Sequence, residues 1–317
     1  MHAHHDPDHG HDHHDHAHEA GHGEHGHPHA HAPAGTRAFA ISLIVNLLFT
    51  AVETAYGLWA DSLALLSDAL HNLGDVLGLA LAGGAAWLAA KPTSEKRTYG
   101  YRRATLLAPL ANALLLVFAA GGLGWEAARR FVQPTEVAPM PLIVVAGIGI
   151  VVNFGSALLF RGHGHDLNQR GAYLHLMADA AVSLAVVLGG LGVLWLGWHW
   201  IDPALALVVG LVVAIGSWKL LRESLDLTLD AVPGHITLAE VEAFLRAQQG
   251  VVDLHDLHVW AMGSSEHALT VHLVRPEGPH DGFLAELSEA LERRFGIGHV
   301  TVQIEADTSM RGRHNCH

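Results

Sequence analysis

The sequence predicts a six-helix transmembrane bundle followed by a small α+β domain. Half of the 317 residues are hydrophobic and only 15% are charged, an unusual balance for a water-soluble protein. The apolar residues gather in six segments that reach the roughly 20 residues a helix needs to cross a bilayer. After residue 231 the long apolar segments are replaced by short stretches in which apolar and polar residues alternate or follow helical spacing. We therefore expect four regions: a tail at 1–36, a transmembrane domain at 37–231, a soluble domain at 232–308 and a tail at 309–317.

The N-terminal tail is rich in histidine. Half of the chain's 28 histidines fall within residues 1–31, interleaved with Asp and Glu and without Lys or Arg. A signal peptide needs a basic start and an apolar core, so this segment is not one. Too few apolar side chains are present to offset ordering, which predicts disorder. Such a density of imidazoles and carboxylates binds zinc, nickel or copper weakly. This favours a native metal-handling tail over a solubilising tail or a purification tag.

The apolar segments are interpreted as six transmembrane helices. Their approximate bounds are 37–60, 62–90, 102–131, 138–160, 169–197 and 201–225. Six spans place both termini on one side. Lys and Arg are concentrated in the connections after the second and fourth spans, which predicts that these face the cytoplasm. Arg129 and Arg130 end the third span on the opposite side and weaken this rule. The balance still predicts a multi-pass protein of the inner (cytoplasmic) membrane with both termini in the cytoplasm.

The charge and cysteine content exclude some classes. The formal net charge is -13 with neutral His, which argues against a nucleic-acid partner because phosphate binding requires basic surfaces. The single cysteine, Cys316, has no partner for an intrachain disulfide.

Residues 232–308 have the pattern of a soluble domain. Apolar residues at helical spacing (Val241, Phe244, Leu245) follow a turn. The alternating stretches LHDLHVWAM and HALTVHLV are separated by GSSE and predict a hairpin. A helix at about 281–295 and a strand HVTVQIEA complete the order helix, strand, strand, helix, strand, which fits an α+β domain with helices on one face of a sheet. About 75 residues make a marginal core, so we expect dimerisation to stabilise it.

Two spans carry the same polar pair. His71 and Asp75 lie four residues apart on the second span, and His175 and Asp179 repeat this spacing on the fifth. Residues four apart share one helix face. Two imidazoles and two carboxylates form one tetrahedral ligand set for Zn²⁺, and the two carboxylates balance its charge. The mixed nitrogen and oxygen set suits Zn²⁺ or Co²⁺ better than Mg²⁺, Ca²⁺ or Cu(I).

The alternative for each polar residue is a hydrogen bond between helices. The duplication of the pair at identical spacing favours a metal site over that alternative. Asp68 lies three residues before His71 and either orients that imidazole or begins the helix. Other polar residues of the spans either line the cation path or fasten the helices together, with fastening as the default interpretation; these are Asn46, Glu53, Asn112, Glu126 and Asn153.

With these residues identified, the chain resembles the cation diffusion facilitator family, in particular its bacterial zinc and cobalt exporters. The resemblance covers everything after about residue 36. The motifs that carry it include SLALLSDALHNLGDVLGLA, YGYRRATLLAPLANALLL, LHLMADAAVSLAVV, WIDPALALVVG, RESLDLTLDAVP and LHDLHVWAM, in this order.

The resemblance implies a homodimeric metal/proton antiporter with a cytoplasmic domain of ferredoxin-like, metallochaperone-like fold. It also implies that His71, Asp75, His175 and Asp179 form the transport site. One departure is Thr105, where the family often has Glu; an ion pair made at that place is in doubt.

The resemblance further implies metal ligands outside the membrane. The matching positions of the cytoplasmic domain are His235, His255, His272, His299 and Glu305, where zinc would be a regulatory ligand; isolated histidines on a sheet are otherwise surface residues. The short loop with His163 and His165 resembles a reduced form of the family's His-rich loop and either passes metal to the transport site or is a solvated turn.

We therefore expect a non-enzymatic transporter that exports Zn²⁺, with Co²⁺ or Cd²⁺ as further substrates, in exchange for protons. The alternatives are a membrane-anchored zinc sensor and a transporter mainly for another divalent metal. A zinc hydrolase would keep an open ligand position and a general base, so four protein ligands argue against an enzyme.

Overall fold

The computed structural model describes residues 34–160, 167–280 and 282–307, with only the backbone described at 34–40 and 167–169. The expectations for the N-terminal tail up to residue 33, for His163 and His165, and for the tail at 309–317 fall outside these residues.

The first six helices confirm the transmembrane bundle. Within the described residues, six helices are long and apolar enough to cross a membrane. Their bounds are α1 Ala34–Trp59, α2 Leu63–Ala89, α3 Ala104–Val132, α4 Pro139–Leu159, α5 Leu167–Leu196 and α6 Ile201–Thr228. Many of their large apolar side chains are exposed, which suits a surface that faces lipid.

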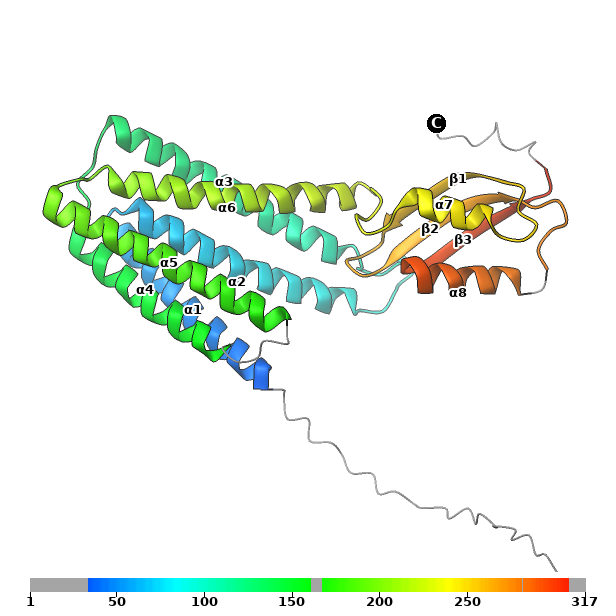
Figure 1. Cartoon of the computed structure of the whole chain (residues 1–317), viewed down its shortest axis with the longest axis horizontal. Helices are drawn as coiled ribbons and strands as arrows, with labels where there is room; N and C mark the ends of the chain where they lie inside the picture. The colour runs from blue at the N-terminus through cyan, green and yellow to red at the C-terminus, as the bar shows by residue number, and fades with distance from the viewer. Residues whose placement is uncertain (1–33, 161–166, 281, 308–317) are drawn as a thin grey trace, which may run out of the picture.

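The helices pack in neighbouring pairs. Helix α3 runs beside α6 and α4 beside α5, while α2 contacts α1, α3, α5 and α6 (Figure 1). Small residues permit this closeness. A β-carbon at Gly74 would lie 2.6 Å from a methyl carbon of Leu116 on α3. Because Gly74 immediately precedes Asp75, this close packing helps to fix the part of α2 that carries the His71 and Asp75 pair.

Asp202, a fully buried carboxylate, ties the start of α2 to α6. It accepts hydrogen bonds from Ser62 Oγ at 2.5 Å, from the Leu63 amide at 2.9 Å and from the Ala64 amide at 3.2 Å. The free amides at a helix start need acceptors, and a carboxylate also stabilises the positive end of the helix dipole. This contact fixes where α2 begins relative to α6.

The two arginines that weaken the charge rule are both paired. Arg130 donates to the Asp61 carbonyl and carboxylate at 2.5 and 2.6 Å and to Glu126 at 3.2 Å. Arg129 donates to Glu126 at 2.9 Å. Arg130 thus fastens the far end of α3 to the α1–α2 turn, whereas the pair of Arg129 with Glu126 lies within α3.

Residues after α6 form the expected α+β domain. Its elements are α7 Leu238–Arg246, β1 Asp253–Ala261, β2 His267–Val274, α8 Phe283–Phe295 and β3 Ile297–Glu305. Strand β2 lies in the middle of the sheet, antiparallel to β1 and parallel to β3. One core joins both helices to the sheet; its fully buried members include Val241, Leu245, Leu269, Leu273, Leu291 and Ile297. The predicted order of elements is confirmed.

The domain lies at the end of the bundle where α2 and α6 end and α3 begins (Figure 1). Thr105 Oγ1 accepts a hydrogen bond from the Ser264 amide at 2.9 Å, in the loop between β1 and β2. Arg102 pairs with Glu266 of the same loop, and Arg103 pairs with Asp230 at 2.8 Å. The residue that departs from the family pattern thus makes a neutral contact between the two domains.

Candidate metal centre

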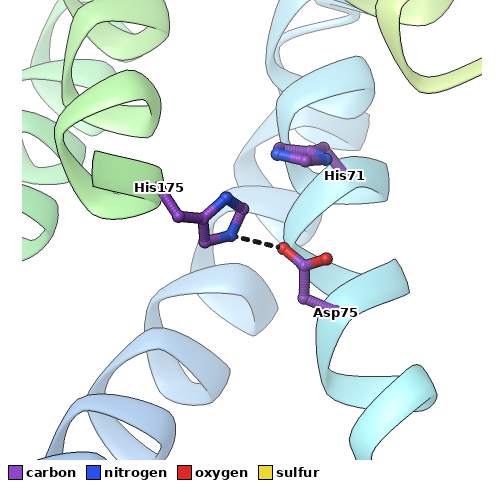
Figure 2. Close-up of side chains that lie close together, drawn as sticks. All are labelled: His71, Asp75 and His175. Carbon is purple, nitrogen blue, oxygen red and sulfur yellow. Dashed lines mark hydrogen bonds and ion pairs between the residues drawn. The ribbon is translucent and has the colours of Figure 1, made fainter. Parts of the chain in front are cut away.

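The two His-x-x-x-Asp pairs meet where α2 and α5 approach each other. His175 Nε2 of α5 lies 2.9 Å from Asp75 Oδ2 of α2, and Figure 2 shows these two side chains pointing at each other. His71 Nε2 of α2 lies 3.3 Å from Asp179 Oδ1 of α5. The structure therefore brings all four predicted transport-site residues together, and each imidazole contacts the carboxylate of the opposite helix.

The spacing of these atoms suits a small divalent ion. Ligand atoms of His71, Asp75 and His175 lie within 4.8 Å of one another, and Asp179 Oδ2 lies 3.6 Å from His175 Nε2. Four tetrahedral ligands at about 2.0–2.1 Å from Zn²⁺ would be separated by about 3.3–3.4 Å. Asp179 contacts both imidazoles but lies outside the three-residue group of His71, Asp75 and His175.

A cavity of about 110 Å³ leads to this cluster. Asp75 and His175 line it and are nearly half exposed, whereas the side chain of Asp179 is only 4% exposed. The cavity is also lined by Ser42 of α1, by Phe160, which follows the last residue of α4, and by Ala172 near the start of α5.

A second layer of polar residues lies behind the cluster. Asn72 Nδ2 donates to Glu53 Oε2 of α1 at 3.4 Å, and Ser183 Oγ of α5 donates to Asp68 Oδ2 at 3.3 Å. The contact of Asn72 with Glu53 fits the fastening interpretation. Ser183 was missed by sequence reasoning, although its position four residues after Asp179 places it on the same face of α5.

A second group of metal-binding side chains lies on the sheet of the soluble domain. His255 and His272 are paired across β1 and β2. Both contact Glu305, at 3.0 Å from His255 Nε2 and 2.9 Å from His272 Nδ1. Desolvation raises the pKa of the Glu305 carboxyl, but its hydrogen bonds to the two histidines outweigh this and lower the pKa below the usual range.

Asp256 is a neighbour of this group that the sequence did not single out. It lies at the irregularity of β1 between His255 and His258 and has a left-handed φ of 53°, a conformation that Asp tolerates better than most residues. Its carboxylate lies 3.8 Å from His272 Nε2 and 3.1 Å from His258 Nε2. Asp256 can therefore add an oxygen ligand or orient His272.

The remaining two predicted residues of this domain lie elsewhere. The His235 ring packs edge-on against His267, with 4.8 Å between centroids. The His299 ring packs against Tyr99, with 5.5 Å between centroids. Within the described chain, the three-residue group of this domain consists of His255, His272 and Glu305.

Comparison with known families decides what kind of protein carries these sites. Residues 39–227 match the family described as cation efflux transmembrane domain, and residues 233–307 match the cation efflux protein cytoplasmic domain. The chain belongs to the cation efflux family, also called the cation diffusion facilitators. This cation efflux protein is a multi-pass membrane transporter of metal ions and not an enzyme.

Several curated proteins are similar over most of their length. The metal cation efflux system protein CzcD of Cupriavidus metallidurans is 39% identical over 277 residues, which cover 86% of this chain and 88% of CzcD. The cadmium, cobalt and zinc/H(+)-K(+) antiporter of Bacillus velezensis is 33% identical, with 85% and 88% covered. The zinc transporter ZitB of Escherichia coli is 34% identical, with 81% and 83% covered.

A solved structure is similar to the soluble part. The metal-bound C-terminal domain of CzcD from Cupriavidus metallidurans is 43% identical and matches over 99% of its length and 22% of this cation efflux protein, with a TM-score of 0.21.

Proposed function

We propose that this cation efflux protein exports Zn²⁺ from the cytoplasm in exchange for protons, with His71, Asp75, His175 and Asp179 as the transport site. The observation that carries this proposal is the crossed pairing of the two His-x-x-x-Asp pairs between α2 and α5. Two carboxylates and two neutral imidazoles give a neutral complex with Zn²⁺, which limits the electrostatic cost of holding a dication inside the membrane.

Proton coupling follows from competition for the same ligands. A metal ligand must be deprotonated before it binds, and imidazoles exchange protons in the physiological range. A higher pH in the cytoplasm then favours loading, and a lower pH outside favours release. Return of two protons for each Zn²⁺ would be electrically neutral, whereas one would move net charge against about 2.3 kcal/mol per charge per 100 mV.

The remaining parts of the proposal concern orientation and regulation. We place the protein in the inner membrane with both termini in the cytoplasm, because the basic connection between α2 and α3 lies at the end of the bundle next to the soluble domain (Figure 1). We also propose a homodimer and a regulatory zinc at His255, His272 and Glu305. His235 and His299 remain candidate ligands, as do His163 and His165 for passing metal inward.

Two alternatives make different predictions. A membrane-anchored sensor would bind Zn²⁺ without moving it, and a transporter for another divalent ion would move that ion faster than zinc. The cadmium and cobalt named for a relative support testing both ions beside zinc.

The test is metal flux into vesicles that contain the purified full-length protein and an internal metal-sensitive dye. We expect zinc flux that increases with a pH gradient and is lost in His175→Ala and Asp179→Ala. His199→Ala, a histidine outside both groups, is the matched control and should retain flux. Unchanged zinc flux in both ligand variants would refute the site, and flux without any response to the gradient would refute proton exchange.

A further inference from the structure

Two acidic side chains lie buried in the bundle behind the transport site. Glu53 of α1 and Asp68 of α2 have no exposed surface. Each has one neutral donor, since Asn72 donates to Glu53 Oε2 and Ser183 donates to Asp68 Oδ2. The second oxygens, Glu53 Oε1 and Asp68 Oδ1, are buried and have no hydrogen-bond partner among the described residues.

Asn72 lies four residues after Asp68 on the same face of α2, so its contact with Glu53 places the Glu53 and Asp68 carboxyl groups close together. Two carboxylates are both acceptors, so no hydrogen bond forms between them unless one carries a hydrogen. Within the described parts of the chain, no Lys or Arg forms an ion pair with either group; the ionisable groups whose charge acts on Asp68 include His71 of α2 and Asp179 of α5. Two unpaired negative charges side by side in a low-dielectric interior would be strongly destabilising.

Asp202 is a buried carboxylate of the same bundle whose oxygens both accept hydrogen bonds. It is also fully buried, but it accepts three hydrogen bonds, from one hydroxyl and two amides. From the described part of the chain, Glu53 and Asp68 together receive two longer bonds, from Asn72 and Ser183. The difference indicates that the acidic pair lacks hydrogen-bond donors.

We propose that Glu53 and Asp68 hold one proton between them, as a proton-binding site distinct from the four metal ligands. The proton comes from water and converts one carboxylate to a carboxylic acid, whose O–H donates to the other carboxylate. The pair then has a net charge of -1, and the new O–H group supplies a hydrogen-bond donor that two carboxylates lack. Similar sharing of one proton is known for closely placed carboxyl pairs in enzymes.

The proton site lies next to the metal ligands, so its proton can take part in transport. This part of the inference rests on the proposed function. Asp68 lies about one turn before His71 on α2, and Ser183 lies about one turn after Asp179 on α5. The pair can hold a proton while the metal occupies its ligands, because neither carboxyl is a member of the ligand set. An exporter that returns two protons would then have a second place for one of them.

Infrared spectroscopy of the full-length protein tests the site directly. The protein is measured at neutral pH in a detergent without ester groups, where a protonated carboxyl gives a C=O stretching band that shifts in D₂O. We expect this band in the natural protein, changed in frequency or lost in Glu53→Gln and in Asp68→Asn, and lost in the double variant. Asp202→Asn and the exposed Asp226→Asn are the matched controls and should keep the band.

Each outcome has a definite meaning. Absence of the band in the natural protein, its persistence in the double variant, or its loss in Asp202→Asn would overturn the inference. Should the double variant fail to fold, an unchanged band in both single variants gives the same negative answer. The vesicle assay with the ligand variants tests the transport site, and the infrared band tests the proton site. Either proposal can therefore be refuted without the other.

Discussion

The Nε2 atom of His175 on α5 lies 2.9 Å from the Asp75 carboxylate on α2, although 100 residues separate them in the chain. His71 and Asp179 make the reciprocal contact at 3.3 Å. The imidazole of each helix therefore contacts the carboxylate of the other helix. A movement of α5 relative to α2 would change both contacts at once, so ligand geometry and helix position are coupled.

The crossed pairing predicts that the ligands act as a unit. We expect His175→Ala and Asp75→Asn each to weaken zinc binding by at least about 100-fold, because either change leaves an incomplete tetrahedral set. The double variant should be little worse than either single variant, since groups that act together are not additive. Isothermal titration calorimetry on the detergent-solubilised protein gives the affinities. Additive losses would show that the two residues bind metal independently.

The composition of the ligand set predicts metal preference. Replacing His71 by Asp exchanges a nitrogen for an oxygen and adds a negative charge, and carboxylate-rich sites suit Mn²⁺ better than imidazole sites do. We expect the ratio of Mn²⁺ to Zn²⁺ flux to increase about tenfold or more in vesicles. His258→Asp, outside the membrane, is the control for the substitution itself. An unchanged ratio would argue that selectivity is decided elsewhere along the path.

Asp202 should be a stability residue. Asp202→Asn removes the charge from a buried acceptor of three hydrogen bonds, and hydrogen bonds to charged groups contribute about 1.5–3 kcal/mol each. We expect a loss of about 2 kcal/mol and a thermal midpoint lower by several degrees, measured by thermal unfolding in detergent. The exposed Asp226→Asn should leave the midpoint unchanged, and equal midpoints for both variants would contradict the capping role.

The group on the sheet predicts a separate zinc. His272→Ala should reduce the zinc bound per chain by one, because it removes one of three convergent ligands, while flux at saturating zinc is retained. Equilibrium dialysis followed by metal analysis gives the count. His280→Ala, a histidine outside the group, serves for comparison, and unchanged stoichiometry in His272→Ala would show that the group does not hold zinc in solution.

Thr105 predicts a local effect at the domain junction. Thr105→Val removes the acceptor of the Ser264 amide, and a hydrogen bond of about 1 kcal/mol corresponds to about fivefold faster opening. Hydrogen exchange followed by mass spectrometry should show this in peptides that contain residues 262–266. Thr54→Val, within α1, should leave these peptides unchanged. Equal exchange in both variants would mean that the loop is held by other contacts, such as the Arg102 and Glu266 pair.

Much of the fold could be predicted because it is encoded locally. The spans follow from runs of apolar residues, and the soluble domain from alternating and helical patterns with their turns. The spacing of His71 and Asp75, repeated at His175 and Asp179, predicted two faces that carry ligands. These inferences depend on local sequence patterns and not on which helices pack against each other.

The sequence by itself determined the membrane class, the order of elements and the four candidate ligands, since periodicity within one helix fixes which residues share a face. Only the tertiary structure decided that the ligands pair crosswise between α2 and α5. It also decided that Ser183 contacts Asp68 and that Asn72 contacts Glu53. It placed His235 and His299 apart from the group of His255, His272 and Glu305 on the sheet. The physical reason is that contacts between distant segments depend on helix packing and strand register, which involve the whole chain at once.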